Sequence, residues 1–297
     1  MKHLVWFLAS LVFGAPALSQ PAVPQGVRPG AYMDHRTDGA SVVVEGEGAT
    51  AHITFYRSSV VRVDWLPPGR TPDSSFAVVQ SPEPEIEPTV HMGPDALWVR
   101  SPQMTVAVQK RPLRLRFTDG AGRELVAEVD SGFVARDTAR SIRFSLTPDT
   151  RLYGTGERVP FGLRGDTLRM QNQAHYGYSE PQLPMKINVP FLTTTGGYGL
   201  FVDNPYPARF MLGAADSTRM KYVTPGGEIT YYVVGEASIP EQLRQYTWLT
   251  GRQPMPPKWS LGYIQSKFGY ETEAQARGVV DTLRRKRVPV DAVILDL

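Results

Sequence analysis

The sequence contains no cysteine, which excludes disulfide bonds and a lipid anchor on a cysteine. It also contains no run of five or six like charges. The formal net charge of +3 therefore reflects a small excess of arginine and not a basic patch, and we expect no nucleic acid partner. With 41% hydrophobic and 21% charged residues, the 297-residue chain has the composition of a soluble protein with a large core.

Several common catalytic motifs are absent as well. The chain has no G-x-S-x-G elbow, no H-E-x-x-H motif and no Walker loop. The segment "GTGERVPFG" (154–162) is glycine-rich, but its spacing does not match a dinucleotide-binding loop and predicts a tight turn beside a strand. The five histidines are scattered, at positions 3, 35, 52, 91 and 175. We therefore expect neither a metal site nor a cofactor.

The first 19 residues have the features of a secretory signal peptide. A short basic start precedes an apolar run, and small residues stand at Ala17 and Ser19, which predicts cleavage after Ser19. The apolar run is too short to span a membrane as a helix. We therefore expect a periplasmic or secreted protein without membrane insertion after cleavage. Residues 20–40 are rich in Pro, Gly and Gln and predict a linker.

From 41 to about 235 the sequence alternates short β-like runs with turn signals. Runs such as "AHITFYR", "MTVAVQK" and "LRLRFTD" alternate in polarity, and "PPG", "GPD" and "TDGAG" stand between runs. This regular spacing predicts an antiparallel β-sandwich. The period changes at Ser238, where a predicted helix with apolar positions Leu243, Tyr246 and Trp248 begins. We place the sandwich domain at 41–253 and the boundary near Pro254.

Residues 254–297 predict one βαβ unit. Strand-like runs at 259–265 and 290–297 flank a helix that starts with a capping box of Thr272 and Gln275. Its apolar face consists of Ala276, Val279, Val280 and Leu283. A single βαβ unit leaves its strands uncovered, so this segment predicts the start of a βα-repeating domain. In a parallel barrel the active site lies just past the carboxyl ends of the strands, where Phe268 and Asp296 stand.

Five segments resemble glycoside hydrolase family 31: "LYGTGER" (152–158), "QNQAHYGYS" (171–179), "VPFLTTTGGYGLFVDN" (189–204), "TGRQPMPPKWSLGYIQSKFGY" (250–270) and "VPVDAVILDL" (288–297). Within that family, the loop 171–179 and "QSKFGY" are most similar to the α-glucosidase and oligosaccharide 4-α-D-glucosyltransferase branch. The resemblance implies an N-terminal galactose-mutarotase-like β-sandwich followed by a (β/α)8 barrel.

The resemblance also predicts which part of the enzyme is present. A barrel takes about 250 residues, so we expect this chain to be a fragment that holds the first βαβ unit. Family members use an Asp nucleophile after the fourth barrel strand and an Asp acid/base after the sixth, because retention needs two carboxylates. Both would lie beyond Leu297. We therefore assign no catalytic residue here and expect the fragment alone to be inactive.

Family analogy assigns three residues to the −1 sugar subsite. It implies that Asp296 binds sugar hydroxyls, as an ionised carboxylate at a strand end is able to do; the alternative is a strand-end cap or a solvated side chain. Phe268 would line the same subsite, with packing at the barrel rim as the alternative. Leu297 matches an apolar contact, and a core position is an equal alternative.

The loop 171–179 matches a sandwich loop that reaches over the barrel mouth. Tyr176 and Tyr178 are candidates for subsites on the leaving-group side, since aromatic rings suit sugar faces; interdomain packing is the alternative. Many family members carry a substrate-binding Asp in this loop, whereas this chain reads Asn-Gln-Ala at 172–174, which favours the transferase-like branch. Arg287 replaces a helix-ending Gly that is frequent in the family, which predicts a strained or differently closed turn.

These features predict a secreted, retaining α-glycosidase that binds an α-linked oligosaccharide or glucoside and acts by hydrolysis or α-glucosyl transfer. The alternative is a non-catalytic, carbohydrate-binding β-sandwich. A third interpretation, a mutarotase, would need a paired His and Glu, and His52, His91 and His175 show no such arrangement. The sugar, the linkage and the oligomeric state stay open.

Overall fold

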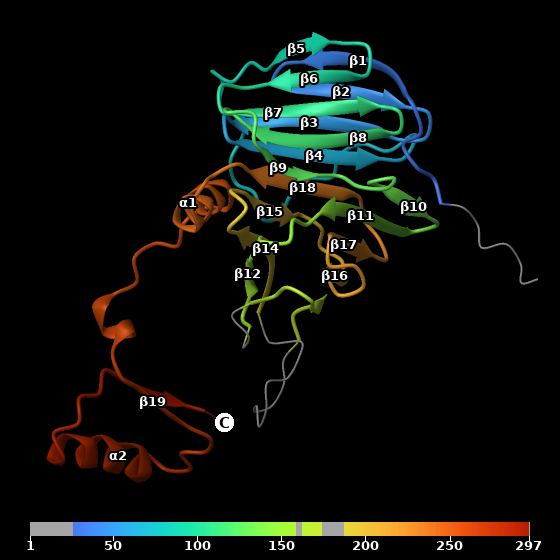
Figure 1. Cartoon of the computed structure of the whole chain (residues 1–297). Helices are drawn as coiled ribbons and strands as arrows, with labels where there is room; N and C mark the ends of the chain where they lie inside the picture. The colour runs from blue at the N-terminus through green and yellow to red at the C-terminus, as the bar shows by residue number, and fades with distance from the viewer. Residues whose placement is uncertain (1–25, 159–161, 174–186, 297) are drawn as a thin grey trace, which may run out of the picture. The chain divides into compact units, whose positions relative to one another are not determined.

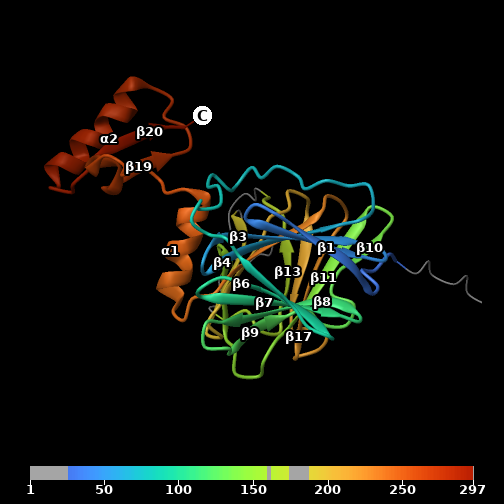
Figure 2. The ribbon, with the colours of Figure 1, turned by 90° about the horizontal axis from the view of Figure 1, so that it is seen from above.

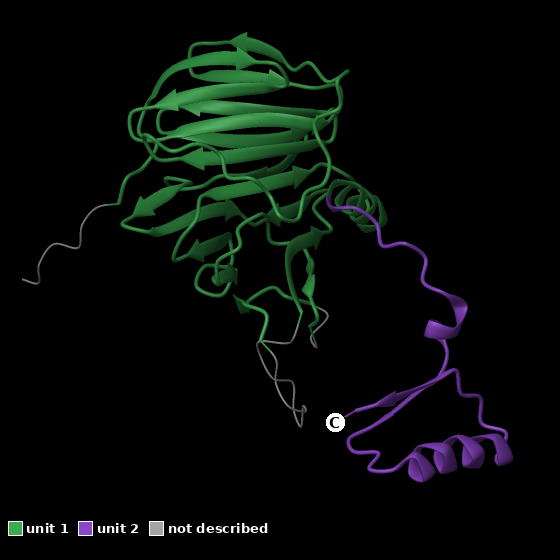
Figure 3. Ribbon diagram, turned by 180° about the vertical axis from the view of Figure 1, so that it is seen from behind, with its two compact units in different colours: residues 1–249 green, residues 250–297 purple. Residues whose placement is uncertain are grey.

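The computed structural model describes residues 26–158, 162–173 and 187–296. The chain divides into two compact units, residues 1–249 and 250–297, which Figure 3 shows in green and purple. The predicted signal peptide, Tyr176, Tyr178 and Leu297 lie outside the described residues.

Unit 1 consists of β-strands and one helix (Figure 1). Its elements are β1 (Tyr32–Asp38), β2 (Ser41–Gly46), β3 (Thr50–Arg57), β4 (Val60–Leu66), β5 (Thr89–Met92), β6 (Ala96–Arg100), β7 (Met104–Lys110), β8 (Leu113–Asp119), β9 (Glu124–Ala127), β10 (Val134–Arg136), β11 (Ala139–Ser145), β12 (Leu152–Gly156), β13 (Thr167–Met170), β14 (Asn188–Thr194), β15 (Gly199–Val202), β16 (Ala208–Leu212), β17 (Arg219–Thr224), β18 (Ile229–Val234) and α1 (Ile239–Thr250).

The strands form an antiparallel sandwich, which confirms the predicted fold of this part. An eight-stranded sheet has the order β1-β2-β3-β4-β18-β15-β14-β12. Two five-stranded sheets, β5-β6-β7-β8-β9 and β10-β11-β17-β16-β13, supply the rest of the sandwich (Figures 1 and 2). One continuous core joins the three sheets and includes Ile53, Phe117 and Phe210.

The polarity pattern of the strands explains this packing. In β3, Ala51, Ile53 and Phe55 are buried, whereas His52 and Thr54 between them are half-buried. Successive side chains of a strand point to opposite faces, so one face of β3 meets the core. The strand β18 is buried at every position, because a second apolar cluster covers the outer face of its sheet.

The predicted linker at 20–40 is wrong in its second half. Tyr32–Asp38 form β1, which pairs with β2 from Tyr32↔Gly46 to Asp38↔Ser41. The strand lies at the sheet edge and most of its side chains are exposed, so it lacks the apolar alternation by which strands are recognised. Charged side chains on an edge strand also discourage pairing with other chains.

The helix α1 confirms the predicted helix. Leu249 and the side chain of Gln242 are buried, Tyr246 and Trp248 pack partly buried against the second apolar cluster, and Leu243 is 45% exposed. The Gln242 amide donates to the carbonyls of Thr194 and Glu236 and accepts from the Thr194 N–H. A polar side chain thus fixes the helix on the sheet by satisfying buried backbone groups.

Unit 2 contains the βαβ unit that the sequence predicts. Strands β19 (Ile264–Lys267) and β20 (Ala292–Leu295) pair in parallel, and α2 (Glu273–Arg285) connects them. The Thr272 hydroxyl accepts from the Gln275 N–H, while the Gln275 side chain accepts from the N–H of Glu271, one residue before the expected partner.

The first predicted strand of this unit begins too early. Residues Lys258–Leu261 form a short 3₁₀ helix, and β19 starts at Ile264. The Ser260 hydroxyl donates to the carbonyl of Pro257 at 2.7 Å, which closes the turn. Serine hydroxyls compete with strand pairing in this way.

The turn after α2 carries the strain that the sequence indicates. Arg287 adopts a left-handed conformation with φ of 56°. Its N–H donates to the carbonyl of Arg284, and the N–H of Val288 donates to the carbonyl of Leu283. These two bonds form a Schellman motif, in which the left-handed position is usually glycine.

We expect Arg287→Gly to stabilise the end of α2 by about 0.5–1 kcal/mol, because glycine adopts this conformation without steric cost. The matched control is Lys286→Gly, which also removes a cation but has φ of −80° and should destabilise the helix end by about 0.5–1 kcal/mol. Amide hydrogen exchange over residues 280–285 measures the stability of the helix end in both variants. Equal changes in the two variants would show that φ of Arg287 is not strained.

A buried carboxylate joins two layers of the sandwich. Glu128 is 3% exposed, and its Oε1 accepts from Trp65 Nε1 and from the Tyr231 hydroxyl, each at 2.6 Å. Its Oε2 accepts from the Leu115 N–H at 3.0 Å. Burial raises the pKa of Glu128 to about 7, although the hydrogen bonds from Tyr231, Trp65 and Leu115 oppose this shift.

Candidate functional site

In unit 2, the two predicted subsite residues stand at corresponding strand ends. The parallel register runs from Ile264↔Ala292 to Lys267↔Leu295, and Phe268 and Asp296 are the next residues along each strand. Parallel strands end at the same edge of a sheet, so the backbone brings these positions to one edge. Phe268 is 72% exposed and Asp296 is exposed. The remaining predicted site residues, Leu297, Tyr176 and Tyr178, lie outside the described part of the chain.

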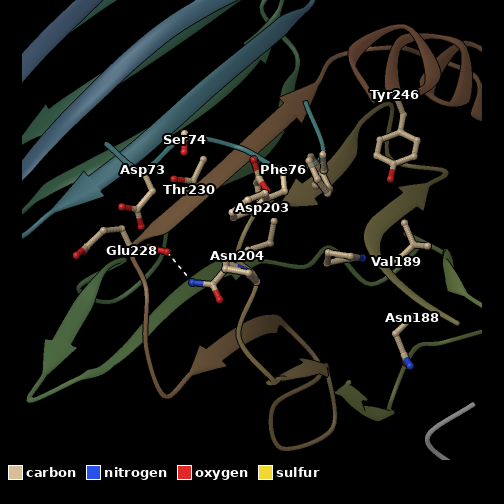
Figure 4. A pocket seen from close by; sticks show the side chains of 15 residues that line it. Asp73, Ser74, Phe76, Asn188, Val189, Asp203, Asn204, Glu228, Thr230 and Tyr246 are labelled. Carbon is tan, nitrogen blue, oxygen red and sulfur yellow. Dashed lines mark hydrogen bonds between the residues drawn. The ribbon is translucent and has the colours of Figure 1, made fainter. Parts of the chain in front are cut away.

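Unit 1 has a pocket of about 440 Å³ on the outer face of the eight-stranded sheet (Figure 4). Residues of β15 and β18 form its floor, and the loop 73–77, the start of β14 and α1 surround it. The labelled lining residues are Asp73, Ser74, Phe76, Asn188, Val189, Asp203, Asn204, Glu228, Thr230 and Tyr246.

The pocket combines an exposed aromatic ring with a half-buried carboxylate. Phe76 is 92% exposed, so its ring is accessible. Asp203 directly follows β15, and burial raises the pKa of its carboxyl, although a hydrogen bond from Ser75 and the charge of Arg62 oppose the shift. Tyr246 stacks on Phe191 with 4.1 Å between ring centroids and is thereby fixed in the wall. An apolar ring with a few convergent polar groups is the usual composition of a small-molecule site.

Hydrogen bonds hold the polar floor of this pocket in place. Asp64 accepts from Arg62 at 2.7–3.0 Å and from the Thr230 hydroxyl at 2.7 Å. The Asn204 amide donates hydrogen bonds to the carbonyls of Gly226 and Glu228. Figure 4 marks the second of these bonds with a dashed line. Because these groups are fixed by the fold, the pocket is largely preformed.

Neither this pocket nor Glu128 was predicted from the sequence. Asp203 stands in "GLFVDN" directly after a buried strand, a position that a pattern search for strand-end acids would find. Phe76 lies in a loop without regular spacing, and nothing in the sequence marks its ring as part of a pocket.

The described histidines do not form the His–Glu pair of a mutarotase. His52 faces Asp64 on the neighbouring strand, and His91 lies beside Trp98 with 5.6 Å between ring centroids. His175 lies outside the described residues. Over 26–158, 162–173 and 187–296, no group of three or more His, Asp, Glu or Cys residues is placed to hold a metal ion.

Comparisons with known proteins agree with both units. Residues 50–210 match the family model of the glycosyl hydrolase 31 N-terminal galactose mutarotase-like domain. Residues 253–297 match that of the glycosyl hydrolases family 31 TIM-barrel domain.

Among curated proteins, the chain is 37% identical over 252 residues to alpha-glucosidase 2 of Bacillus thermoamyloliquefaciens, covering 82% of this chain and 32% of that protein. It is 25% identical over 323 residues to a 1,6-alpha-glucosyltransferase of Sporosarcina globispora, and the match covers 99% of this chain and 24% of that protein. Among solved structures, a Flavobacterium johnsoniae GH31 dextranase complexed with glucose superimposes with a TM-score of 0.85 at 26% identity. The match covers 90% of this chain and 34% of that chain. The chain thus spans about a quarter to a third of the length of these relatives.

Proposed function

Because the chain belongs to glycoside hydrolase family 31, we propose that it is the amino-terminal part of a secreted, retaining α-glycosidase. The enzyme acts on α-glucosides by hydrolysis or by α-glucosyl transfer. The observation that carries this proposal is the parallel pair β19–β20, which brings Phe268 and Asp296 to one edge within the segment that matches the barrel.

In this proposal unit 2 supplies one wall of the −1 subsite. There Asp296 binds sugar hydroxyls through charge-assisted hydrogen bonds, and Phe268 packs against the sugar ring. The nucleophile and the acid/base belong to barrel strands that follow β20 in the longer protein. Retention requires these two carboxylates about 5–5.5 Å apart, with one forming the glycosyl-enzyme and the other transferring the proton.

Secretion is proposed from the sequence of the first 19 residues, with cleavage after Ser19. None of the helices in the described part of the chain has the length and apolar character needed to cross a bilayer.

The activity test compares two proteins on aryl α-glucosides and aryl α-xylosides. We expect the protein with all eight barrel strands to turn over the α-glucoside faster, since alpha-glucosidase 2 matches more of this chain than the alpha-xylosidases do. The 297-residue chain should show no turnover, because the nucleophile and the acid/base belong to later barrel strands. A preference for the xyloside, or turnover by the 297-residue chain, would contradict the proposal.

A second candidate function, carbohydrate binding by the sandwich, is favoured by the pocket of Figure 4. The exposed ring of Phe76 offers a face for sugar C–H groups, and Asp203 offers a carboxylate for a pair of hydroxyls. We expect isomaltose or maltose to bind the chain in calorimetry, and Phe76→Ala and Asp203→Asn each to weaken binding about tenfold. Met92→Ala, an exposed apolar side chain outside the pocket, is the control. Unchanged binding in both pocket variants would exclude this site.

A further inference from the structure

The sheet β10-β11-β17-β16-β13 gathers cations on its outer face. Along each strand, buried positions alternate with exposed or half-buried ones, so the outward side chains are identified from the burial pattern. Every charged side chain among them is basic, and together they are Arg136, Arg143, Arg169, Arg209, Arg219 and Lys221. The sequence predicts no basic patch, because the net charge is small and the chain has no run of five or six like charges. That prediction is wrong for this face, since the strand pairing brings together cations that are separated in the sequence.

The strand register places like charges directly opposite each other. Arg169 pairs with Arg209 across β13 and β16, and Arg143 pairs with Lys221 across β11 and β17. Neighbouring strands are about 4.8 Å apart, so each pair of cations lies side by side. Like charges in directly opposite positions destabilise a sheet.

In the described part of the chain, acidic neighbours pair with only two of these six cations, Arg143 and Arg219. Asp130 lies 2.7 Å from Arg219 and 4.0 Å from Arg143, and Asp216 lies 3.1 Å from Arg219. Within the described residues, no ion pair joins Arg136, Arg169, Arg209 or Lys221 to an acid.

The pKa of Lys221 is lowered on this face. Burial lowers the pKa of its ammonium group, and the charges of Arg143 and Arg136 lower it further. A bound polyanion would remove this repulsion, so the free energy of binding includes relief of the unfavourable interactions in the free protein.

We propose that this face binds an acidic polysaccharide, with Arg136, Arg169, Arg209 and Lys221 contacting its carboxylate groups. Arginine dominates the set, and its planar guanidinium matches a carboxylate with two parallel hydrogen bonds. An extended polyuronate lying across the strands meets cations from adjacent strands in succession. Such binding would retain an enzyme that acts on neutral glucosides within a charged polysaccharide matrix.

Two other polyanions fit this face less well. A lipid surface favours exposed apolar side chains beside the cations, but the large exposed hydrophobic residues of unit 1 lie outside these five strands. Single-stranded nucleic acid favours aromatic side chains on which bases stack, and the outward positions of these strands hold none. Both are therefore outcomes that the test distinguishes.

The test measures binding of the full 297-residue chain to polygalacturonate at low and at physiological salt. We expect salt-dependent binding, and we expect the triple variant Arg169→Gln, Arg209→Gln, Lys221→Gln to bind about tenfold more weakly or worse. The control variant is Arg100→Gln, Arg252→Gln, Lys258→Gln. It also removes two arginines and one lysine, but from exposed positions outside this face, and it should bind within about twofold of wild type.

A thermal melt accompanies each variant. The triple variant should melt at the same or a higher temperature than wild type at low salt, because two like-charge pairs are gone. Equal loss in the patch and control variants, or no binding to polygalacturonate at low salt, would overturn the proposal. Tighter binding to single-stranded DNA or to phosphatidylglycerol vesicles, lost in the patch variant, would overturn it in favour of those partners.

Discussion

Glu128→Gln should lower the free energy of unfolding of the sandwich by about 1–3 kcal/mol at pH 5. Both carboxyl oxygens of Glu128 accept hydrogen bonds, from Trp65 and Tyr231 on one oxygen and from the Leu115 N–H on the other. An amide nitrogen cannot accept, so either orientation of the glutamine leaves a buried N–H facing another donor. Protonation of the native carboxyl has no such cost, since a carboxylic acid oxygen still accepts.

The same variant should change how stability depends on pH. The folded pKa of Glu128, about 7, lies above its ordinary value of 4.5. Folding then binds a proton between these values, so the contribution of Glu128 is fully present below pH 4.5 and is lost as pH rises through 7. The change amounts to roughly 3 kcal/mol over this window. Glutamine does not titrate, so the stability gap between wild type and variant should shrink or reverse by pH 8.

Urea denaturation of both proteins at pH 5 and pH 8 measures this gap. Tyr231→Phe is a useful companion, because it removes one donor and leaves the Trp65 and Leu115 bonds to the carboxylate intact. A gap of the same size at both pH values would show that the pKa of Glu128 is not raised in the folded protein.

Asp296→Asn, in the protein that carries all eight barrel strands, should reduce kcat/KM for a maltooligosaccharide about tenfold or more. A charge-assisted hydrogen bond contributes about 1.5–3 kcal/mol, and the contact tightens as the sugar ring flattens towards the oxocarbenium-like transition state. Asp296 is exposed at the strand end, so the melting temperature should change little. Phe268→Ala should chiefly raise KM.

Asp291→Asn on the same segment is the matched control. The Asp291 carboxylate accepts from the Tyr263 N–H at 3.1 Å, a structural contact ahead of β20. This control should lower stability while leaving kcat/KM of the folded enzyme close to wild type. Near-wild-type kcat/KM in Asp296→Asn would remove Asp296 from the subsite, and a collapsed melt would assign it a structural role.

The sequence predicted the elements whose stability depends on local pattern. The alternating runs of β3 and β7 identify strands because one face of each is buried in the sandwich. The helix α2 was predicted from its capping box and apolar face, and the strain at Arg287 from a residue that stands where glycine is usual. These signals are encoded within a few neighbouring residues.

Features that depend on tertiary neighbours were missed. The strand β1 is polar and is held by pairing with β2, and Gln242 is buried where its side-chain amide bonds to the backbone of Thr194. The cationic face arises from residues of five strands, and the pocket at Asp203 needs a loop, three strands and a helix together. No local pattern encodes such juxtapositions.

The most direct test of the proposed function is to trap the glycosyl-enzyme. A 5-fluoro-α-D-glucosyl fluoride reacts with a retaining α-glucosidase but leaves its covalent intermediate slow to hydrolyse, so the intermediate accumulates. Peptide mapping by mass spectrometry of the longer protein should find one glycosyl group on a carboxylate that follows β20, outside residues 1–297. The 297-residue chain alone should remain unlabelled. Labelling of a residue within this chain, or turnover without any trapped intermediate, would contradict the account.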